Sequence, residues 1–264
     1  MKIKEITNYL ESIAPLSYQE SYDNAGLLTG NPNEEVTGVL LSLDCIETVI
    51  EEAISKKCNL VVAHHPIIFG GLKKLIGRNY VERTVIKAIK NDIAIYAIHT
   101  NLDNVLNGVN AKIAEKIGLE NTKILVLKYN LPQSQEVGSG MIGDLPEPME
   151  ASNFLKHLKE KMQVNCIKHT ALLGKKIKKI AICGGAGGFL LRNAIAAGAD
   201  IFITSDYKYH EFFDADSQIV IADIGHYESE QFTKDLLADF LEKQFETLNI
   251  HISAVNTNPV NYFV

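Results

Sequence analysis

The stretch VLLSLDCIETVIEEAISKKCNLVVAH, residues 39–64, decides the fold class. Residues 39–44 and 60–64 are short apolar runs typical of buried strands, and residues 47–57 between them repeat apolar positions at a helical period. A strand, a helix and a second strand in this order form a β–α–β unit, and the two strands of such a unit run parallel. We therefore predict an α/β protein with largely parallel sheets flanked by helices.

The rest of the chain continues the alternation of short apolar runs and amphipathic segments. The sequence predicts further helices over residues 2–14, 108–117, 151–162, 189–197 and 227–247, and further strands over residues 94–99, 123–128, 179–183, 200–205, 218–223 and 249–255. Gly118 is well placed to end the helix before it, because glycine is the preferred residue just after a helix.

The same number of residues separates two predicted strands in each part of the chain. The apolar run at Val39 is followed by one at Leu60, a step of 21 residues, and the run at Ile180 is followed by one at Ile201 at the same step. Two β–α–β units of equal length predict a duplicated α/β architecture. In such sheets, ligands bind at the carboxyl ends of the strands.

Residues 130–150 interrupt this pattern and predict a loop where two halves join. We expect a first α/β half over residues 1–130, a connection over 131–150 and a second half over 151–264. The interruption contains Pro132, Pro146, Pro148, Gly138, Gly140 and Gly143. The three glycines match a dinucleotide-binding fingerprint as text, but prolines follow where that fingerprint needs a helix, so we reject this interpretation.

Composition excludes several classes of protein. The 264 residues are 46% hydrophobic and 22% charged, which excludes a disordered, collagen-like or coiled-coil chain. The net charge of −6 argues against nucleic acid as the expected partner. Four cysteines without a CxxC pair favour a reduced, cytoplasmic setting. The first residues do not resemble a signal peptide, and no apolar run approaches the ~18 residues of a membrane span, so we expect no membrane partner.

The pair His64-His65, followed by Pro66, ends the second strand of the β–α–β segment over residues 39–64. Adjacent side chains on a regular strand point to opposite faces, so both imidazoles can serve one site only where the strand ends. Pro66 favours that placement because it cannot continue a central ladder. The alternative is one buried and one exposed histidine.

Other metal-type ligands follow other predicted strands. His99 and Asp103 come after the strand over residues 94–99, and His226 and Glu230 lie four residues apart at the opening of a helix. Residues four apart share one helix face. For His226 and Glu230 taken alone, the alternative is an ordinary surface pair. Together, these segments bring imidazoles and carboxylates to one predicted edge of the sheet.

These motifs resemble, in chain order, those of the Nif-three-like family, also called the GTP cyclohydrolase 1 type 2 family. The resemblance covers essentially the whole chain. It rests on YDNAGLLTG (22–30), AHHPIIFGG (63–71), HTNLD (99–103), GSGMIGDL (138–145), CGGAGG (183–188) and GHYESE (225–230).

The resemblance implies a dinuclear divalent-metal site at the strand carboxyl edges between the halves, and a ring-shaped homo-hexamer. Some relatives carry a domain inserted between the halves, and the short 131–150 connection resembles the version without it, as a single compact unit. The implied ligands are His64, His65, Asp103, His226 and Glu230, with Glu230 bridging the ions. Mixed imidazole and carboxylate ligands suit Zn, Mn, Fe or Ni. A site of residual positive charge favours a small anionic or nucleotide-like substrate, and paired metals favour hydrolysis.

Several neighbouring residues are candidates for supporting roles. We interpret Glu230, His99 and His210 as the candidate catalytic residues, with His99 able to orient a ligand or bind substrate and His210 able to shuttle protons. Asp206 and Lys208 precede His210 and face the same predicted edge. Simpler readings remain open, because His99 can be a structural histidine and the residues near His210 a solvated loop.

Two patterns have both a functional and a structural interpretation. The CGGAGG loop lies between a strand and a helix, where its N–H groups could hold an anion or form a tight turn. Cys45 and Cys183 lie near strand ends and fit buried apolar positions better than ligand positions.

Three functions fit these residues. The first is a metal-dependent hydrolase of a nucleotide-like substrate, with opening of the GTP ring as the activity that the resemblance implies. The second is a metal-binding regulatory or assembly protein without turnover. The third is a metal-dependent phosphoesterase or nuclease. Ligand residues alone do not specify the substrate.

Overall fold

The computed structural model describes residues 1–128 and 136–263. The chain folds into two compact units. The first unit comprises Met1–Leu102 and Thr233–Pro259, and the second comprises Asp103–Phe232 and Val260–Val264. Each unit has its own sheet and its own core.

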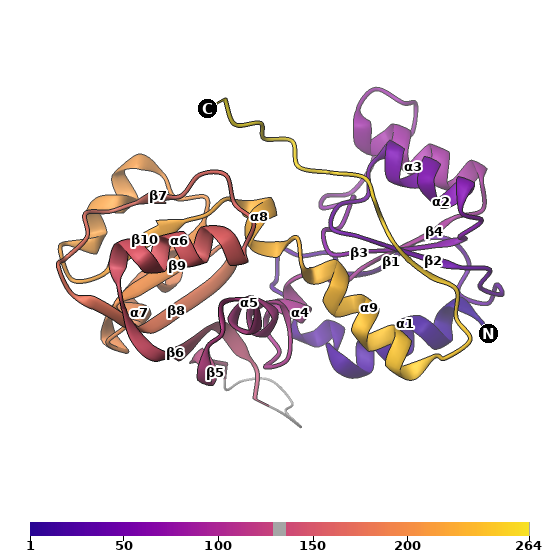
Figure 1. Ribbon diagram of the computed structural model, residues 1–264. Helices are drawn as coiled ribbons and strands as arrows, with labels where there is room; N and C mark the ends of the chain where they lie inside the picture. Colours follow the sequence, from indigo (N-terminus) through magenta and orange to yellow (C-terminus); the bar gives the residue numbers. More distant parts are fainter. Residues whose placement is uncertain (129–135, 264) are drawn as a thin grey trace. The chain divides into compact units, whose positions relative to one another are not determined.

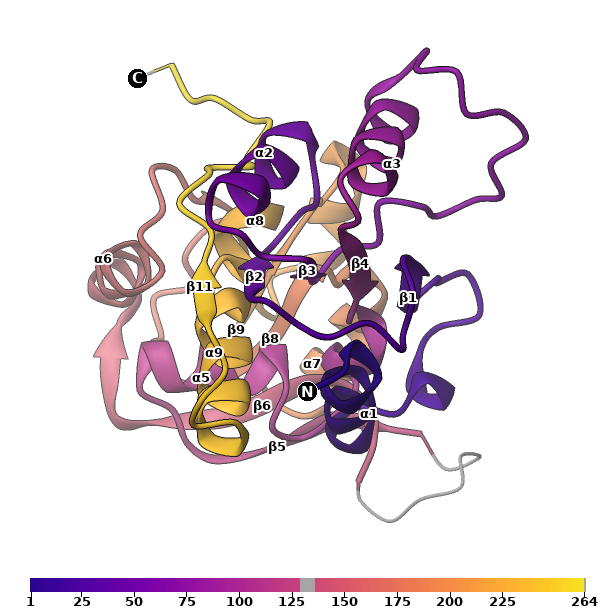
Figure 2. The same ribbon diagram turned by 90° about the vertical axis from the view of Figure 1, so that its right-hand side faces the viewer.

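The first unit is built on a five-stranded sheet in the order β1-β4-β3-β2-β11. Figure 2 shows these strands side by side. Three of the neighbouring pairs are parallel, and only β1 runs antiparallel to its neighbour β4. The strands are β1 (Gly26–Thr29), β2 (Val39–Ser42), β3 (Leu60–Ala63), β4 (Ala94–Ala97) and β11 (Ile250–Ile252).

Helices cover both faces of this sheet. Figure 1 shows α2 and α3 over one face and α1 and α9 over the other. The bounds are α1 (Ile3–Ile13), η1 (Leu16–Tyr18), α2 (Glu47–Ser55), α3 (Tyr80–Lys90) and α9 (Thr233–Gln244). Under α2 and α3, the fully buried residues Val61 and Ile95 of the sheet pack with Ile50 of α2 in one apolar cluster. Apolar strands buried on both faces are typical of parallel sheets.

The start of α3 is fixed by a buried carboxylate. Glu82 is 2% exposed. Its carboxylate accepts hydrogen bonds from the backbone N–H groups of Ile76 and Arg78, at 3.1 and 3.0 Å, and from the Arg78 guanidinium. The hydrogen bonds from Arg78 and Ile76 lower the pKa of Glu82 to about 2, against the smaller opposing effect of burial. Glu82 therefore fastens the segment before α3 to the helix.

The second unit is built on a six-stranded sheet in the order β5-β6-β8-β9-β10-β7. The pairs β8–β9 and β9–β10 are parallel, and the other pairs are antiparallel. The strands are β5 (Glu120–Leu127), β6 (Gly138–Glu150), β7 (Lys168–His169), β8 (Lys176–Ala186), β9 (Ile201–Ser205) and β10 (Val220–Asp223).

Helices α5, α6 and α8 of the second unit pack on β8. On the sheet, Ala181, Phe202 and Ile221 pack with Leu191 and Ala194 of α7 in a second apolar cluster. The bounds are α4 (Thr100–Asp103), α5 (Val109–Ile117), α6 (Ala151–Lys161), η2 (Gly188–Leu190), α7 (Leu191–Ala196), η3 (Tyr209–Ala215) and α8 (His226–Glu230). In the part of the chain that the structure describes, no helix is long and apolar enough to cross a membrane.

The predicted fold class is confirmed, and so are the two β–α–β units. Val39 pairs with Leu60 in parallel β2 and β3, and Ile180 pairs with Ile201 in parallel β8 and β9. The same 21-residue step thus joins register partners in both sheets. Gly118 caps α5 in the left-handed conformation, at a φ of 77°, as expected.

The loop expected over residues 130–150 is wrong for residues 138–150, which form β6. Pro146 and Pro148 fall where the register of β6 against β8 shifts, between Asp144 and Met149. Proline is tolerated at such irregularities, so these residues do not prevent a strand. The glycines of the rejected dinucleotide fingerprint also lie in β6, which confirms the rejection.

Pro132 lies outside the described residues, and the division of the chain into halves at residues 131–150 stays a prediction. The helix expected over residues 227–247 is interrupted, since α8 ends at Glu230 and α9 begins at Thr233.

We predict that Phe202→Ala lowers the free energy of unfolding by about 3–5 kcal/mol, because it leaves a cavity in the core of the second unit. Urea denaturation followed by circular dichroism measures this loss. The control is Phe189→Ala, which removes a ring that is 69% exposed and should change stability by less than about 0.5 kcal/mol. Equal losses in the two variants would contradict the assigned core.

We predict that Glu82→Gln destabilises the protein at neutral pH and that this difference from the parent depends on pH. Because folding lowers the pKa of Glu82 from 4.5 to about 2, its stabilising contribution is complete above 4.5 and is lost as the pH falls through 2. Urea denaturation at a series of pH values should show the difference shrinking over that interval. A difference that does not change with pH would contradict the assignment.

Candidate metal centre

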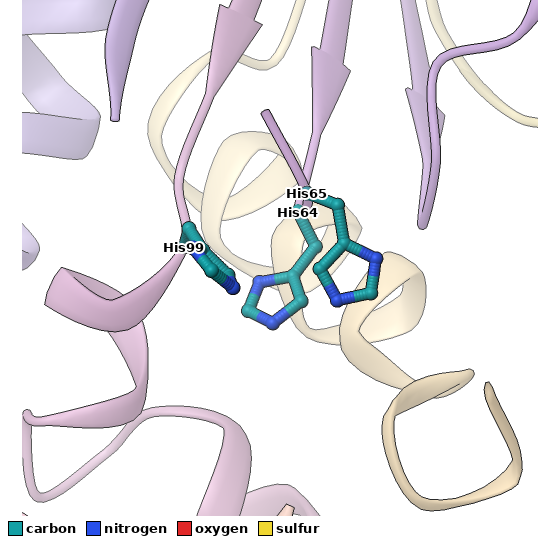
Figure 3. Close-up of side chains that lie close together, drawn as sticks. All are labelled: His64, His65 and His99. Carbon is teal, nitrogen blue, oxygen red and sulfur yellow. The ribbon is translucent and has the colours of Figure 1, made fainter. Parts of the chain in front are cut away.

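His64 and His65 lie directly after β3, and their two rings lie close to each other. Figure 3 shows both imidazoles just beyond the end of the strand. The ring centroids are 4.9 Å apart. His64 is fully buried and the His65 side chain is 15% exposed. The alternative of one buried and one exposed histidine is therefore wrong.

His99, which follows β4, faces this pair from the neighbouring strand (Figure 3). Its ring centroid lies 5.3 Å from each of the other two. One nitrogen of each of the three rings lies within 4.8 Å of the others, so these histidines could hold a metal ion. Parallel strands place their carboxyl ends at the same edge of a sheet, which explains why β3 and β4 bring them together.

An oxygen acceptor fixes the Nδ1 atom of each of these histidines. The His64 Nδ1 atom is 2.8 Å from the backbone oxygen of Ile98. The His65 Nδ1 atom is 2.8 Å from a carboxylate oxygen of Asp44, and the His99 Nδ1 atom is 2.8 Å from a carboxylate oxygen of Asp23. A neutral imidazole in this setting carries its proton on Nδ1. It therefore presents the Nε2 lone pair as a metal ligand.

The two aspartates are held ionised. Burial alone would raise the pKa of Asp23, but the hydrogen bonds from His99 and Thr100 lower it to about 2. Burial also opposes ionisation of Asp44, and its hydrogen bonds from His65 and Thr257 lower its pKa. An ionised carboxylate is the stronger acceptor for an imidazole N–H. Both aspartates therefore strengthen the preference for a proton on Nδ1.

The second unit holds another donor group, on α8. His226 and Glu230 sit one turn apart, and the His226 Nε2 atom is 3.1 Å from a Glu230 carboxylate oxygen. The His226 Nδ1 atom is 2.6 Å from a carboxylate oxygen of Asp206. The predicted pairing of His226 with Glu230 on one helix face is thus confirmed.

The carboxylate of Asp103 lies close to that of Glu230. Oxygen atoms of the two residues lie within 4.8 Å of each other. Glu230 is only 3% exposed. Asn110 positions this part of the unit, because its side chain donates to the backbone oxygen of Asp103 and accepts from the N–H of Gly184. Two carboxylates this close repel each other unless a proton or a cation compensates their charge.

The CGGAGG loop supports this donor group through hydrogen bonds from three of its N–H groups. The N–H of Gly185 donates to the Ser229 hydroxyl at 2.9 Å, and the N–H of Gly187 donates to the Thr204 hydroxyl at the same distance. The N–H of Gly184 is already bonded to Asn110. Side-chain oxygens of the same unit already accept these three hydrogen bonds, so these N–H groups are not presented to an anion.

Gly185 also makes room for the ligand side chains. Its φ is +64°, and a Cβ atom at this position would lie 2.4 Å from a Glu230 carboxylate oxygen and 3.3 Å from the His226 ring. A larger residue at position 185 would displace the carboxylate. The glycine motif is therefore part of the candidate centre, for a steric reason that the sequence pattern did not reveal.

His210 and Lys208 lie at the start of η3, and Cys183 is buried as predicted. His210 is exposed on η3, with its ring against those of Tyr209 and Phe213, and its catalytic role stays a prediction. Lys208 lies 3.8 Å from the Glu211 carboxylate at the start of the same element. Cys183 is buried, and burial together with the charges of Asp103 and Glu230 raises the pKa of its thiol.

The sequence reasoning missed Asp44 as the acceptor for His65 and did not pair Asp206 with His226. Asp44 follows β2 just as His64 follows β3, so its place at a strand end was the available signal.

Comparison with known proteins identifies the family. The sequence profile of Duf34/NIF3 (NGG1p interacting factor 3) matches residues 1–259. A Campylobacter jejuni protein named GTP cyclohydrolase 1 type 2 homolog is 34% identical, with all of both chains covered. A Clostridium acetobutylicum protein of the same name is 31% identical, with 99% of each chain covered.

Solved structures agree with this result. The fold matches the Staphylococcus aureus protein SA1388 with a TM-score of 0.92 at 31% identity, over 100% of this chain and 99% of that one. A Bacillus cereus protein related to NIF3 matches with a TM-score of 0.90 at 26% identity, at the same coverage. The matched profile, the curated relatives and the shared architecture together show that this chain belongs to the Duf34/NIF3 family.

Proposed function

We propose that the protein is a hydrolase that depends on two divalent metal ions and acts on a small nucleotide-like substrate. The proposed ligands are His64, His65, Asp103, His226 and Glu230, as the family resemblance implies. The observation that carries the proposal is the shared orientation of the imidazoles. In each ligand histidine, Nδ1 faces an oxygen acceptor, so Nε2 is the nitrogen presented to a metal.

The donor group of the second unit supports a cation for a reason of its own. Both ring nitrogens of His226 face carboxylate oxygens, from Asp206 and Glu230. Each short contact needs a hydrogen or a cation between the nitrogen and the oxygen, and with the hydrogen of a neutral ring on Nδ1, either a further proton or a metal ion meets this need at Nε2. The nearby Asp103 carboxylate adds further negative charge beside Glu230. Divalent ions compensate such a group of carboxylates better than a single proton does.

The ligand chemistry limits the metal and the reaction. Imidazole and carboxylate donors suit Zn, Mn, Fe or Ni. Two bound divalent ions would supply Lewis-acid activation of water and stabilisation of developing negative charge. The residues of this chain orient the ligands, through Asp44 and Asp206, and keep the Glu230 carboxylate away from bulk water.

His99 is proposed to move a proton during hydrolysis. Its Nδ1 atom is held by the ionised Asp23, and its ring lies beside those of His64 and His65. A carboxylate on Nδ1 stabilises the imidazolium that forms when Nε2 accepts a proton. This pair can therefore act as a general base and then as a general acid.

The names of the relatives point to GTP as the first substrate to test, with opening of its imidazole ring as the reaction. A ring-shaped homo-hexamer and a cytoplasmic location also remain part of the proposal. The competing possibilities are a metal-binding protein without turnover and a metal-dependent phosphoesterase or nuclease.

We predict that the full-length protein binds two Zn²⁺ ions per chain and that Glu230→Gln binds at most one, because the amide cannot replace a bridging carboxylate. Plasma mass spectrometry after dialysis gives the stoichiometry. The control is Glu228→Gln, which changes a buried carboxylate on the same helix and should keep two ions.

The same samples test turnover with GTP and with a panel of phosphoesters. Conversion of GTP to the ring-opened formamide, or to formate if a second water cleaves that formamide, supports the proposed reaction when the parent shows it and Glu230→Gln does not. Two tightly held ions without any turnover would favour the binding protein, and turnover of phosphoesters alone would favour the phosphoesterase. A parent protein that retains no ions would contradict the metal centre.

We predict that Gly185→Ala weakens Zn²⁺ binding at least about 10-fold, because the added methyl group occupies the position of the Glu230 carboxylate. Isothermal titration measures the affinity. The matched control is Gly174→Ala, since Gly174 has a similar φ of +68° and an added Cβ there meets no atom within 4 Å.

Both alanine variants carry the same backbone strain, so a difference between them reports the contact with Glu230. Equal Zn²⁺ affinities in Gly185→Ala and Gly174→Ala would contradict the proposed role of Gly185. A loss of folded structure in Gly185→Ala, seen by circular dichroism, would show that the carboxylate cannot move aside.

A further inference from the structure

The 69–75 loop follows the paired histidines and is fastened at both ends. At one end, the Asn24 side chain donates to the backbone oxygen of Ile68 at 2.6 Å. At the other end, the Glu82 carboxylate accepts from the N–H groups of Ile76 and Arg78. Every residue of the loop itself is exposed. The loop is thus held in place beside the histidine cluster while its side chains remain accessible.

Phe69 joins this loop to the candidate centre. Its ring lies 5.7 Å from the His99 ring, centroid to centroid, at an interplanar angle of 85°. The residue is nevertheless 54% exposed. An aromatic ring that packs edge to face against one neighbour and is open to solvent elsewhere has a surface on which a planar ring can stack.

The same loop carries positive charge. Lys73 and Lys74 are exposed, and within the described residues neither side chain forms an ion pair or a hydrogen bond. Arg78, by contrast, is bound to Glu82. The chain as a whole has a net charge of −6, and these two adjacent lysines place positive charge on the loop that carries Phe69. Lysine ammonium groups bind phosphate as point charges.

The separation between Phe69 and the two lysines is short enough for one ligand to contact both. Lys73 and Lys74 follow Phe69 by four and five positions, which limits their backbone separation from it to about 18 Å. A planar heteroaromatic ring that carries a chain of phosphate groups has an apolar, stackable end and an anionic end. Apolar ligands match Phe69 alone, and inorganic anions match the lysines alone.

We propose that the 69–75 loop recognises the substrate of the metal centre, with Phe69 stacking on its heteroaromatic ring and Lys73 and Lys74 pairing with its phosphate groups. This inference rests on the proposed function, because it assigns the loop to the substrate of that site. It makes these three residues determinants of specificity, distinct from the metal ligands.

The test is isothermal titration of the full-length, Zn²⁺-loaded protein with GTP, guanosine and inorganic triphosphate. Phe69→Ala should weaken binding of GTP and guanosine about 5- to 100-fold and leave triphosphate binding unchanged, because it removes the stacking partner. Phe69→Trp should restore the affinity. Lys73→Gln/Lys74→Gln should weaken binding of GTP and triphosphate and leave guanosine unchanged.

Two control variants account for general effects. Phe213→Ala removes an aromatic ring that is 67% exposed in the second unit, and Lys175→Gln/Lys176→Gln removes two adjacent exposed lysines there. Neither should alter binding of any of the three ligands. Losses in the controls equal to those in the loop variants would overturn the proposal, as would parent-like GTP affinity in both loop variants or no binding by the parent.

Measuring the bound Zn²⁺ in each sample separates this inference from the proposed function. If the parent retains no zinc but its GTP affinity still falls in the loop variants, the metal centre fails and the loop assignment stands. If the parent holds two ions and the loop variants bind all three ligands as the parent does, the loop assignment fails alone.

Discussion

The candidate centre depends on one repeated interaction, the hydrogen bond from an imidazole Nδ1 to an oxygen. His64 makes it to a backbone carbonyl, and His65, His99 and His226 make it to carboxylates. Each bond fixes both the tautomer and the direction of the ring. Without these acceptors, packing alone would set the orientation of the four rings, and nothing would fix their tautomer. The acceptors of His64, His65 and His226 lie just after strands β4, β2 and β9, and Asp23, the acceptor of His99, lies in the loop before β1. The α/β architecture therefore positions the groups that orient the ligands.

Much of the architecture could be predicted because it depends on local patterns. The unit from β2 to β3 and the unit from β8 to β9 follow from apolar runs and helical periodicity, and their equal step of 21 residues reappears in the strand register. Strand β6 could not be predicted, because its prolines indicated a loop. The register shift that accommodates them is set by pairing with β8, which is distant in sequence.

The histidine pair and the pairing of His226 with Glu230 were also predictable, since each depends on residues close together in sequence. The acceptor Asp44 was missed, because which side chain beyond the end of β2 faces His65 depends on packing between two strand ends that are 21 residues apart. The same holds for Gly185, whose small size matters only because Glu230 lies against it. Sequence patterns thus identify donor residues better than the neighbours that orient them.

The most direct test of this account is a crystal structure of the zinc-loaded protein with anomalous diffraction measured at the zinc absorption edge. We expect two anomalous peaks per chain, bonded to the Nε2 atoms of His64, His65 and His226, with each Nδ1 atom still on its oxygen acceptor. Zinc bound through Nδ1, or peaks only at sites remote from these residues, would contradict it.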